Sequence, residues 1–240
     1  MLSNVYYVGK IGKVNVDFNA DYYWSGKKEQ MHNMERFTEV GSPESIQNIH
    51  SDRATYNRLL ASKLVLSVPL ASGSLSFGGE LSTSRRKSRY SLLPRALVND
   101  DDSRIKENMT SALVEYSNTF GKLHVQAGMR YEHIRFNYYY QERLIAKQSK
   151  SYGNFFPSLA LSMPIGNTQM QLTFATDIYR PSYYDLRDGV QYNNRYTYDS
   201  GNPFLVPSIS RNIGYAFSWQ WMQFSVMYTH LSDEICTLVQ

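Results

Sequence analysis

Apolar and polar residues alternate at every second position in ten segments of the chain, and this period of two constrains the fold more than any other feature. In the clearest segment, residues 123–132, every odd position is apolar and every even position is polar, charged or glycine. Successive side chains of a strand point to opposite faces of a sheet, so one face meets lipid or a core and the other meets water. In a bilayer the apolar face must be the outer one, because a basic residue near the midplane costs about 2–4 kcal/mol.

Nine further segments carry the same pattern, four of them regularly and five less regularly. The regular segments are 14–24, 74–81, 169–177 and 222–229, and the less regular ones are 3–10, 57–70, 108–120, 154–163 and 212–219. The sequence therefore predicts an all-β, antiparallel transmembrane barrel wall of about ten strands.

The connections between these segments alternate between short and long. Short turns are predicted near residues 11–12, 71–73, 121–122, 165–167 and 220, and long connections near 25–53, 85–104, 141–152 and 181–207. Bacterial outer-membrane barrels have short periplasmic turns on one rim and long extracellular loops on the other. A soluble β-sandwich is the alternative, but it rarely needs strands of ten or more residues and does not sort its loops by length.

Composition agrees with a membrane wall built from strands. The chain is 42% hydrophobic with a mean hydropathy of −0.46, and nothing in it approaches the run of about 20 apolar residues that a membrane helix requires. Tyrosine, phenylalanine and tryptophan make up 14% of the residues and gather near strand ends, which is typical of interfacial aromatic girdles. Ordinary cross-strand aromatic packing is the alternative explanation for any single cluster.

Charge and cysteine content exclude several classes of protein. The single cysteine, Cys236, rules out an internal disulfide framework, and no Cys/His spacing resembles a zinc site. The net charge of +4 is dispersed, with basic runs at 27–28 and 85–87 in predicted loops, so we expect no nucleic-acid partner. The run 31–34, Met-His-Asn-Met, offers soft copper ligands but is more simply a loop. We expect no cofactor and no bound metal.

One pair of motifs resembles the outer-membrane β-barrel family of TonB-dependent receptor-like proteins. Residues 178–186 read Ile-Tyr-Arg-Pro-Ser-Tyr-Tyr-Asp-Leu, and residues 196–207 read Tyr-Thr-Tyr-Asp-Ser-Gly-Asn-Pro-Phe-Leu-Val-Pro. Members of that family end a strand with Arg-Pro-Ser-Tyr-x-x-Leu and re-enter after a long loop through Gly-Asn-Pro-x-Leu-x-Pro. The motif residues, which we expect to be structural because they end ladder pairing and form turns, are Arg180, Pro181, Ser182, Gly201, Asn202, Pro203 and Pro207. This chain has Arg187-Asp188 where the family usually continues Asn-Pro.

The resemblance implies a barrel that encloses an N-terminal plug and imports a nutrient too large for porins, with energy from the inner-membrane TonB complex. We expect residues 1–240 to be a single barrel segment, with the plug and the closing C-terminal strands absent and the natural start, with its export signal, lying upstream. The segment would form half of a larger barrel, as an incompletely closed sheet, or close as a small ten-stranded barrel. The implied partners are outer-membrane lipid, the TonB complex through the missing plug, and a surface lipoprotein.

Polar residues on the inner face and tyrosines of the last long loop are the candidate ligand-binding residues. The inner-face candidates are Asp17, Asp21, Glu80, His124, Arg130, Glu132, Asp177 and Arg180, and the loop candidates are Tyr183, Tyr184, Tyr192, Tyr196 and Tyr198. The alternative is that the charged residues only hydrate the wall and pair across strands, and Arg130 and Glu132 are placed for such a pair.

The sequence favours a receptor in the bacterial outer membrane that imports a bulky nutrient of the siderophore, glycan or peptide class. A non-transporting surface barrel, such as an adhesin or a passive porin, is the alternative, and a plug domain upstream would decide between them. Catalysis is not expected, because His133 and Glu132 are neighbours in a strand and face opposite ways, and no serine lies in a nucleophile-elbow context.

Overall fold

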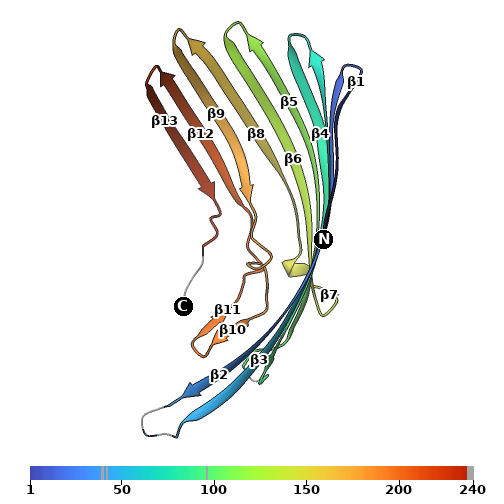
Figure 1. The fold of residues 1–240 in the computed structure, drawn as a ribbon, viewed down its shortest axis with the longest axis vertical. Coiled ribbons are helices and arrows are strands. Elements are labelled where there is room, and N and C mark those ends of the chain that lie inside the picture. The colour runs from blue at the N-terminus through green and yellow to red at the C-terminus, as the bar shows by residue number, and fades with distance from the viewer. Residues whose placement is uncertain (39–40, 42, 96, 237–240) are drawn as a thin grey trace.

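Ten long antiparallel strands form one curved, open sheet in the computed structural model, which describes residues 1–236 except 39, 40, 42 and 96 (Figure 1). We call these ten strands the wall. They are β1 (Leu2–Ile11), β2 (Val14–Phe37), β3 (Ser45–Leu70), β4 (Gly73–Leu93), β5 (Asp101–Phe120), β6 (Leu123–Tyr140), β8 (Lys150–Ile165), β9 (Thr168–Tyr179), β12 (Ser208–Trp219) and β13 (Met222–Ser232). Each of the ten predicted segments lies within one of them. The wall leaves β1 and β13 as its edges, so the open sheet is observed and the small ten-stranded closure is not.

Smaller elements lie in the long connections. The short strand β7 (Arg143–Leu144) pairs with β6 and is followed by a 3-10 turn, η1 (Ala146–Gln148), while β10 (Gln191–Asn194) and β11 (Thr197–Asp199) form a separate hairpin. The predicted connections 141–152 and 181–207 contain these elements. No helix in the described part of the chain is long and apolar enough to cross a membrane.

The five predicted short turns are confirmed, and they all lie at one end of the sheet (Figure 1). Each is two residues long and begins with a residue of positive φ: Gly12, Ala71, Gly121, Gly166 and Gln220. A left-handed first residue lets a two-residue turn follow the right-handed twist of the strands that it joins.

The first two predicted long connections are wrong in extent. Strand β2 continues to Phe37 and β3 begins at Ser45, and their ladder runs without a break from Asn15–Ser67 to Phe37–Ser45. In the same way β4 continues to Leu93 and β5 begins at Asp101. The basic runs 27–28 and 85–87 and the run 31–34 are therefore strand residues. Charged residues are poor strand formers, but pairing with a neighbouring strand overrides that local preference.

The sense of the alternation reverses toward the end of the sheet that carries the long connections, as β6 shows. Up to Tyr131 the apolar side chains point outward, with Met129 and Tyr131 41% and 38% exposed, whereas beyond Glu132 the apolar side chains Ile134, Phe136 and Tyr138 point inward and are buried. We call the face with Arg130 and Glu132 the lumen face and the opposite face the outer face. We infer that the reversal marks the edge of the lipid-facing band. Beyond it, on the side of the long connections, the lumen face packs on a loop.

That loop, residues 180–207, is called the docked loop, because it returns across the lumen face and closes two apolar cores. One core contains Ile49, Tyr90, Leu92 and Val98 with Tyr192 of the loop. The other contains Ile105, Ile134, Phe136 and Tyr138 with Leu186 of the loop. The wall thus supplies most of each core, and the docked loop supplies one buried side chain to each.

Candidate functional site

The docked loop is tied to the wall at its first residue. Arg180 forms an ion pair with Glu132 of β6, and the other carboxylate oxygen of Glu132 lies 3.7 Å from the guanidinium of Arg130. The side chain of Glu132 is only 3% exposed. A buried carboxylate between two arginines is a cross-link, so three of the predicted binding residues meet here in a contact that positions the loop.

The two halves of the family motif meet inside the docked loop. The Ser182 hydroxyl accepts a hydrogen bond from the Asp185 backbone N–H at 3.2 Å, and the Asp185 carboxylate accepts one from the Ser182 N–H at 2.8 Å. From the second half, the Asn202 N–H donates to the Asp185 carbonyl at 2.6 Å. A Cβ at Gly201 would lie 2.4 Å from that carbonyl oxygen and 2.7 Å from the Arg187 carbonyl oxygen. Glycine is required there because the two arms approach so closely.

Further contacts hold the docked loop against the lumen face. The Tyr183 hydroxyl donates to Ser84 of β4 at 2.9 Å, the Tyr192 hydroxyl donates to Glu35 of β2 at 2.7 Å, and Lys150 of β8 donates to the Leu205 carbonyl at 2.6 Å. Burial raises the pKa of the Tyr183 phenol, and the nearby Glu107 carboxylate raises it further. The hydroxyl therefore keeps its proton at neutral pH and remains a donor.

A cavity of about 470 Å³ lies between the wall and the docked loop. On one side it is lined by lumen-facing residues of β2 to β6, and on the other by Tyr183, Tyr184, Arg187 and Gln191 of the loop. Its charged lining residues are four bases and one acid: Lys27, Arg53, Arg86, Arg187 and Glu29. Such a lining suits an anionic ligand, because guanidinium groups bind carboxylate and phosphate with two parallel hydrogen bonds.

Arg187 is the unusual member of this lining. Its side chain stacks on the Tyr184 ring at 3.6 Å, the residue is 7% exposed, and none of its three guanidinium nitrogens has a hydrogen-bond partner among the described residues. Arg53 and Arg86, by contrast, donate to Gln191 and Asn57. A buried cation without partners is costly, and an acceptor group of a ligand in the cavity would satisfy it.

The structure brings two of the predicted residues, Tyr183 and Tyr184, to this cavity and leaves the others outside it. The register places Asp17, Asp21, Glu80, His124 and Asp177 on the lumen face, as expected, but none of them lines the cavity. Asp21 and Asp177 accept hydrogen bonds from asparagine side chains of neighbouring strands. Tyr196 is 82% exposed on the hairpin, and Tyr198 packs edge-on against Tyr192.

Three arginines of the cavity were not among the predicted residues. Arg53 and Arg86 fell inside segments predicted as loops, and Arg187 stands where the chain departs from the family motif. That departure was the one available signal. Among the described residues, no group of three or more His, Cys, Asp or Glu side chains is placed to hold a metal ion.

The fold resembles solved structures of outer-membrane uptake proteins. The chain aligns with copper transporter OprC at a TM-score of 0.62 and 11% identity, covering 97% of this chain and 38% of that one. It aligns with FpvA from P. aeruginosa, solved with an iron-loaded pyoverdine, at a TM-score of 0.57 and 11% identity, covering 96% of this chain and 32% of that one. It aligns with the ferric yersiniabactin uptake receptor FyuA from Yersinia pestis at a TM-score of 0.54 and 12% identity, covering 92% of this chain and 36% of that one. The chain therefore spans about a third of the length of these structures.

A comparison with curated proteins finds no match. The model of the Outer membrane protein beta-barrel family, in contrast, matches residues 10–239, nearly the whole chain. Together with the solved structures, this match confirms the resemblance to the barrels of TonB-dependent receptor-like proteins and the location in the bacterial outer membrane. The wall, the docked loop and the motif that joins them are thus accounted for by one conclusion: the chain belongs to the Outer membrane protein beta-barrel family.

Proposed function

We propose that this chain is part of an outer-membrane receptor that binds and imports a bulky anionic nutrient, of the class of carboxylate-bearing metal chelates. The observation that carries the proposal is the unpartnered, buried guanidinium of Arg187 in a cavity with three further basic side chains. Tyrosine side chains of the wall and the docked loop add apolar and stacking surface beside these charges.

The names of similar structures support the same class of ligand. They include the ferric yersiniabactin uptake receptor, a receptor bound to an iron-loaded pyoverdine, and a ferric citrate transporter, the last at a TM-score of 0.52 and 10% identity. Energy for import would come from the TonB complex through a plug domain, and a surface lipoprotein is a further candidate partner.

Replacement of Arg187 tests the binding site. We expect Arg187→Gln to weaken binding of ferric citrate, used as the anionic probe, by about 10- to 100-fold, because a hydrogen bond to a charged group contributes about 1.5–3 kcal/mol. The measurement is uptake of radiolabelled ferric citrate over a range of concentrations by cells that carry each variant in place of the natural gene, and the half-saturating concentration reports the change in binding.

The matched control is Arg195→Gln. Arg195 also stacks on an aromatic ring at 3.6 Å, that of Phe37, but it is exposed and lies outside the cavity. Uptake of the anionic chelate that survives deletion of the gene would contradict chelate import by this protein. Gene-dependent entry of small solutes of either charge without an energised inner membrane would instead indicate a passive porin.

A further inference from the structure

A row of like charges crosses the outer face of the wall. In the cross-strand register Arg58 of β3 lies opposite Arg85 of β4, and Arg85 lies opposite Lys106 of β5. Arg135 of β6 lies on the same face, one row nearer the short turns. We call these four residues the basic row. Three of them are exposed, and Lys106 is partly buried.

The basic row has no acidic partners among the residues that the structure describes. None of its members forms an ion pair or a side-chain hydrogen bond there. The Lys106 ammonium lies 5.1 Å from the centre of the Tyr139 ring, and its charge is only the smallest of the causes that lower the pKa of Glu142. Like charges directly opposite each other in an antiparallel sheet destabilise the pairing, because their Cβ atoms are only about 4.5–5.5 Å apart. An arrangement of this kind calls for an anion from outside the chain.

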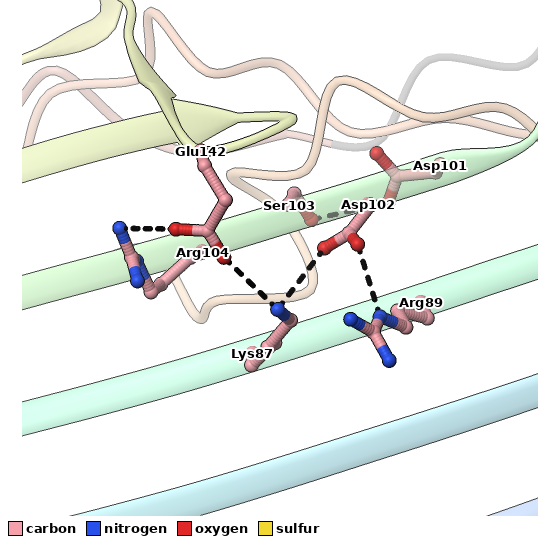
Figure 2. A network of polar contacts seen from close by, with 7 residues as sticks. All are labelled: Lys87, Arg89, Asp101, Asp102, Ser103, Arg104 and Glu142. Carbon is pink, nitrogen blue, oxygen red and sulfur yellow. Dashed lines mark hydrogen bonds and ion pairs between the residues drawn. The ribbon is translucent and has the colours of Figure 1, made fainter.

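In the neighbouring rows of the same face the basic side chains are paired with carboxylates, as Figure 2 shows. Lys87 lies 3.0 Å from Glu142 and 3.8 Å from Asp102, Arg104 lies 2.6 Å from Glu142, and Arg89 lies 2.9 Å from Asp102. These pairs hold the pKa of Glu142 below its usual range, with the Lys87 hydrogen bond as the main cause. Basic residues farther from the short turns are thus in direct ion-pair contact with carboxylates, and those of the basic row are not.

The basic row lies at the level of lipid headgroups. From Arg58 toward the short turns, the outer face of β3 carries at every second position Leu60, Ser62, Leu64, Leu66, Val68 and Leu70. This run spans about 33 Å along the strand, or about 25 Å along the membrane normal at the usual strand tilt, which is the height of the apolar band of such barrels. Trp24, opposite Arg58 on β2 and 43% exposed, lies where tryptophan is enriched at the membrane interface.

We propose that the basic row binds the phosphate-bearing headgroup of a membrane lipid, a phosphorylated glycolipid of the outer leaflet whose acyl chains lie along the leucines of β3. Guanidinium groups bind phosphate with paired hydrogen bonds. Arg58, Arg85 and Lys106 lie on neighbouring strands, close enough together to bind more than one oxygen of the same phosphate group. The site is on the opposite face of the wall from the cavity, so it does not depend on the proposed import function.

The test is native mass spectrometry of the purified protein in detergent, after incubation with a bisphosphorylated lipid A glycolipid. We expect the triple variant Arg58→Gln, Arg85→Gln, Lys106→Gln to retain at least tenfold less glycolipid than the natural sequence. The matched control, Lys10→Gln, Lys13→Gln, Lys122→Gln, removes the same charge from exposed residues at the short-turn end and should retain it fully. Heat-modifiable electrophoretic mobility verifies that both variants are folded.

Two further ligands identify the chemistry and its source. The same glycolipid without its phosphates is expected to bind at least tenfold less well, and inorganic phosphate at the same concentration is expected neither to bind nor to compete. Equal retention by the two triple variants, undiminished binding of the dephosphorylated lipid, or equally good binding of inorganic phosphate would each overturn the proposal.

Discussion

Arginine in place of Leu64 is expected to lower the free energy of unfolding by about 2–4 kcal/mol, while arginine in place of the next residue, Val65, lowers it by less than about 1 kcal/mol. Leu64 lies near the middle of the apolar run of β3 on the outer face and is 42% exposed. A guanidinium at that depth would lie in hydrocarbon. Val65 lies on the lumen face opposite Asp17 of β2, where an added arginine meets water and an acidic neighbour.

The measurement is equilibrium unfolding of each variant by urea in phospholipid vesicles, followed by tryptophan fluorescence. Leu64→Ala serves as the control for lost side-chain volume, since it removes the leucine without adding a charge. Equal destabilisation by the two arginine variants, or a greater loss at Val65, is incompatible with the assignment of the two faces.

Removal of the Glu132 carboxylate is expected to be the second large effect. Glu132→Leu leaves Arg130 and Arg180 without their shared partner, and breaking a buried ion pair from one side costs about 3–5 kcal/mol. The side chains of Arg130 and Arg180 are 40% and 33% exposed. Solvent screening therefore reduces the expected loss of unfolding free energy to about 1–3 kcal/mol. Because Arg180 begins the docked loop, the loop should also separate more readily from the wall.

Urea unfolding measures the stability loss, and the rate of protease cleavage within residues 180–207 measures the release of the loop. Glu115→Gln is the matched control, because Glu115 also lies on the lumen face of the wall but has no ion-pair partner among the described residues. If Glu132→Leu left both the stability and the cleavage rate as they are with Glu115→Gln, Glu132 would not be the anchor of the loop.

Much of the membrane part of the fold was predictable, because the bilayer imposes a simple rule on every strand. In residues 123–131 each outward position is apolar, so the strand and the face of each side chain follow from the period of two. The same rule places the five turns, since the chain must reverse where the apolar run ends.

The part of the sheet beyond the apolar band, on the side of the long connections, was not predictable in the same way. There the outer face meets water and the lumen face meets the docked loop, so the alternation of residues such as Arg85, Arg86 and Lys87 no longer follows the membrane rule and resembles a solvated loop. Only the ladder with β3 and β5 shows that they are strand residues. The cavity depends on Arg187 meeting residues far away in the sequence, and a contact of that kind leaves no local pattern.

Spin labels at residues 64 and 65 test most directly whether the apolar face of the wall meets lipid. Leu64→Cys and Val65→Cys would each be made with Cys236→Ser, because Cys236 is the single cysteine of residues 1–240, and labelled in vesicles. We expect the label at 64 to collide mainly with oxygen, which concentrates in the bilayer, and the label at 65 to collide mainly with a water-soluble nickel chelate. The opposite ranking, or water-like accessibility at both positions, would contradict a lipid-facing outer surface and with it the account of this protein as a barrel wall.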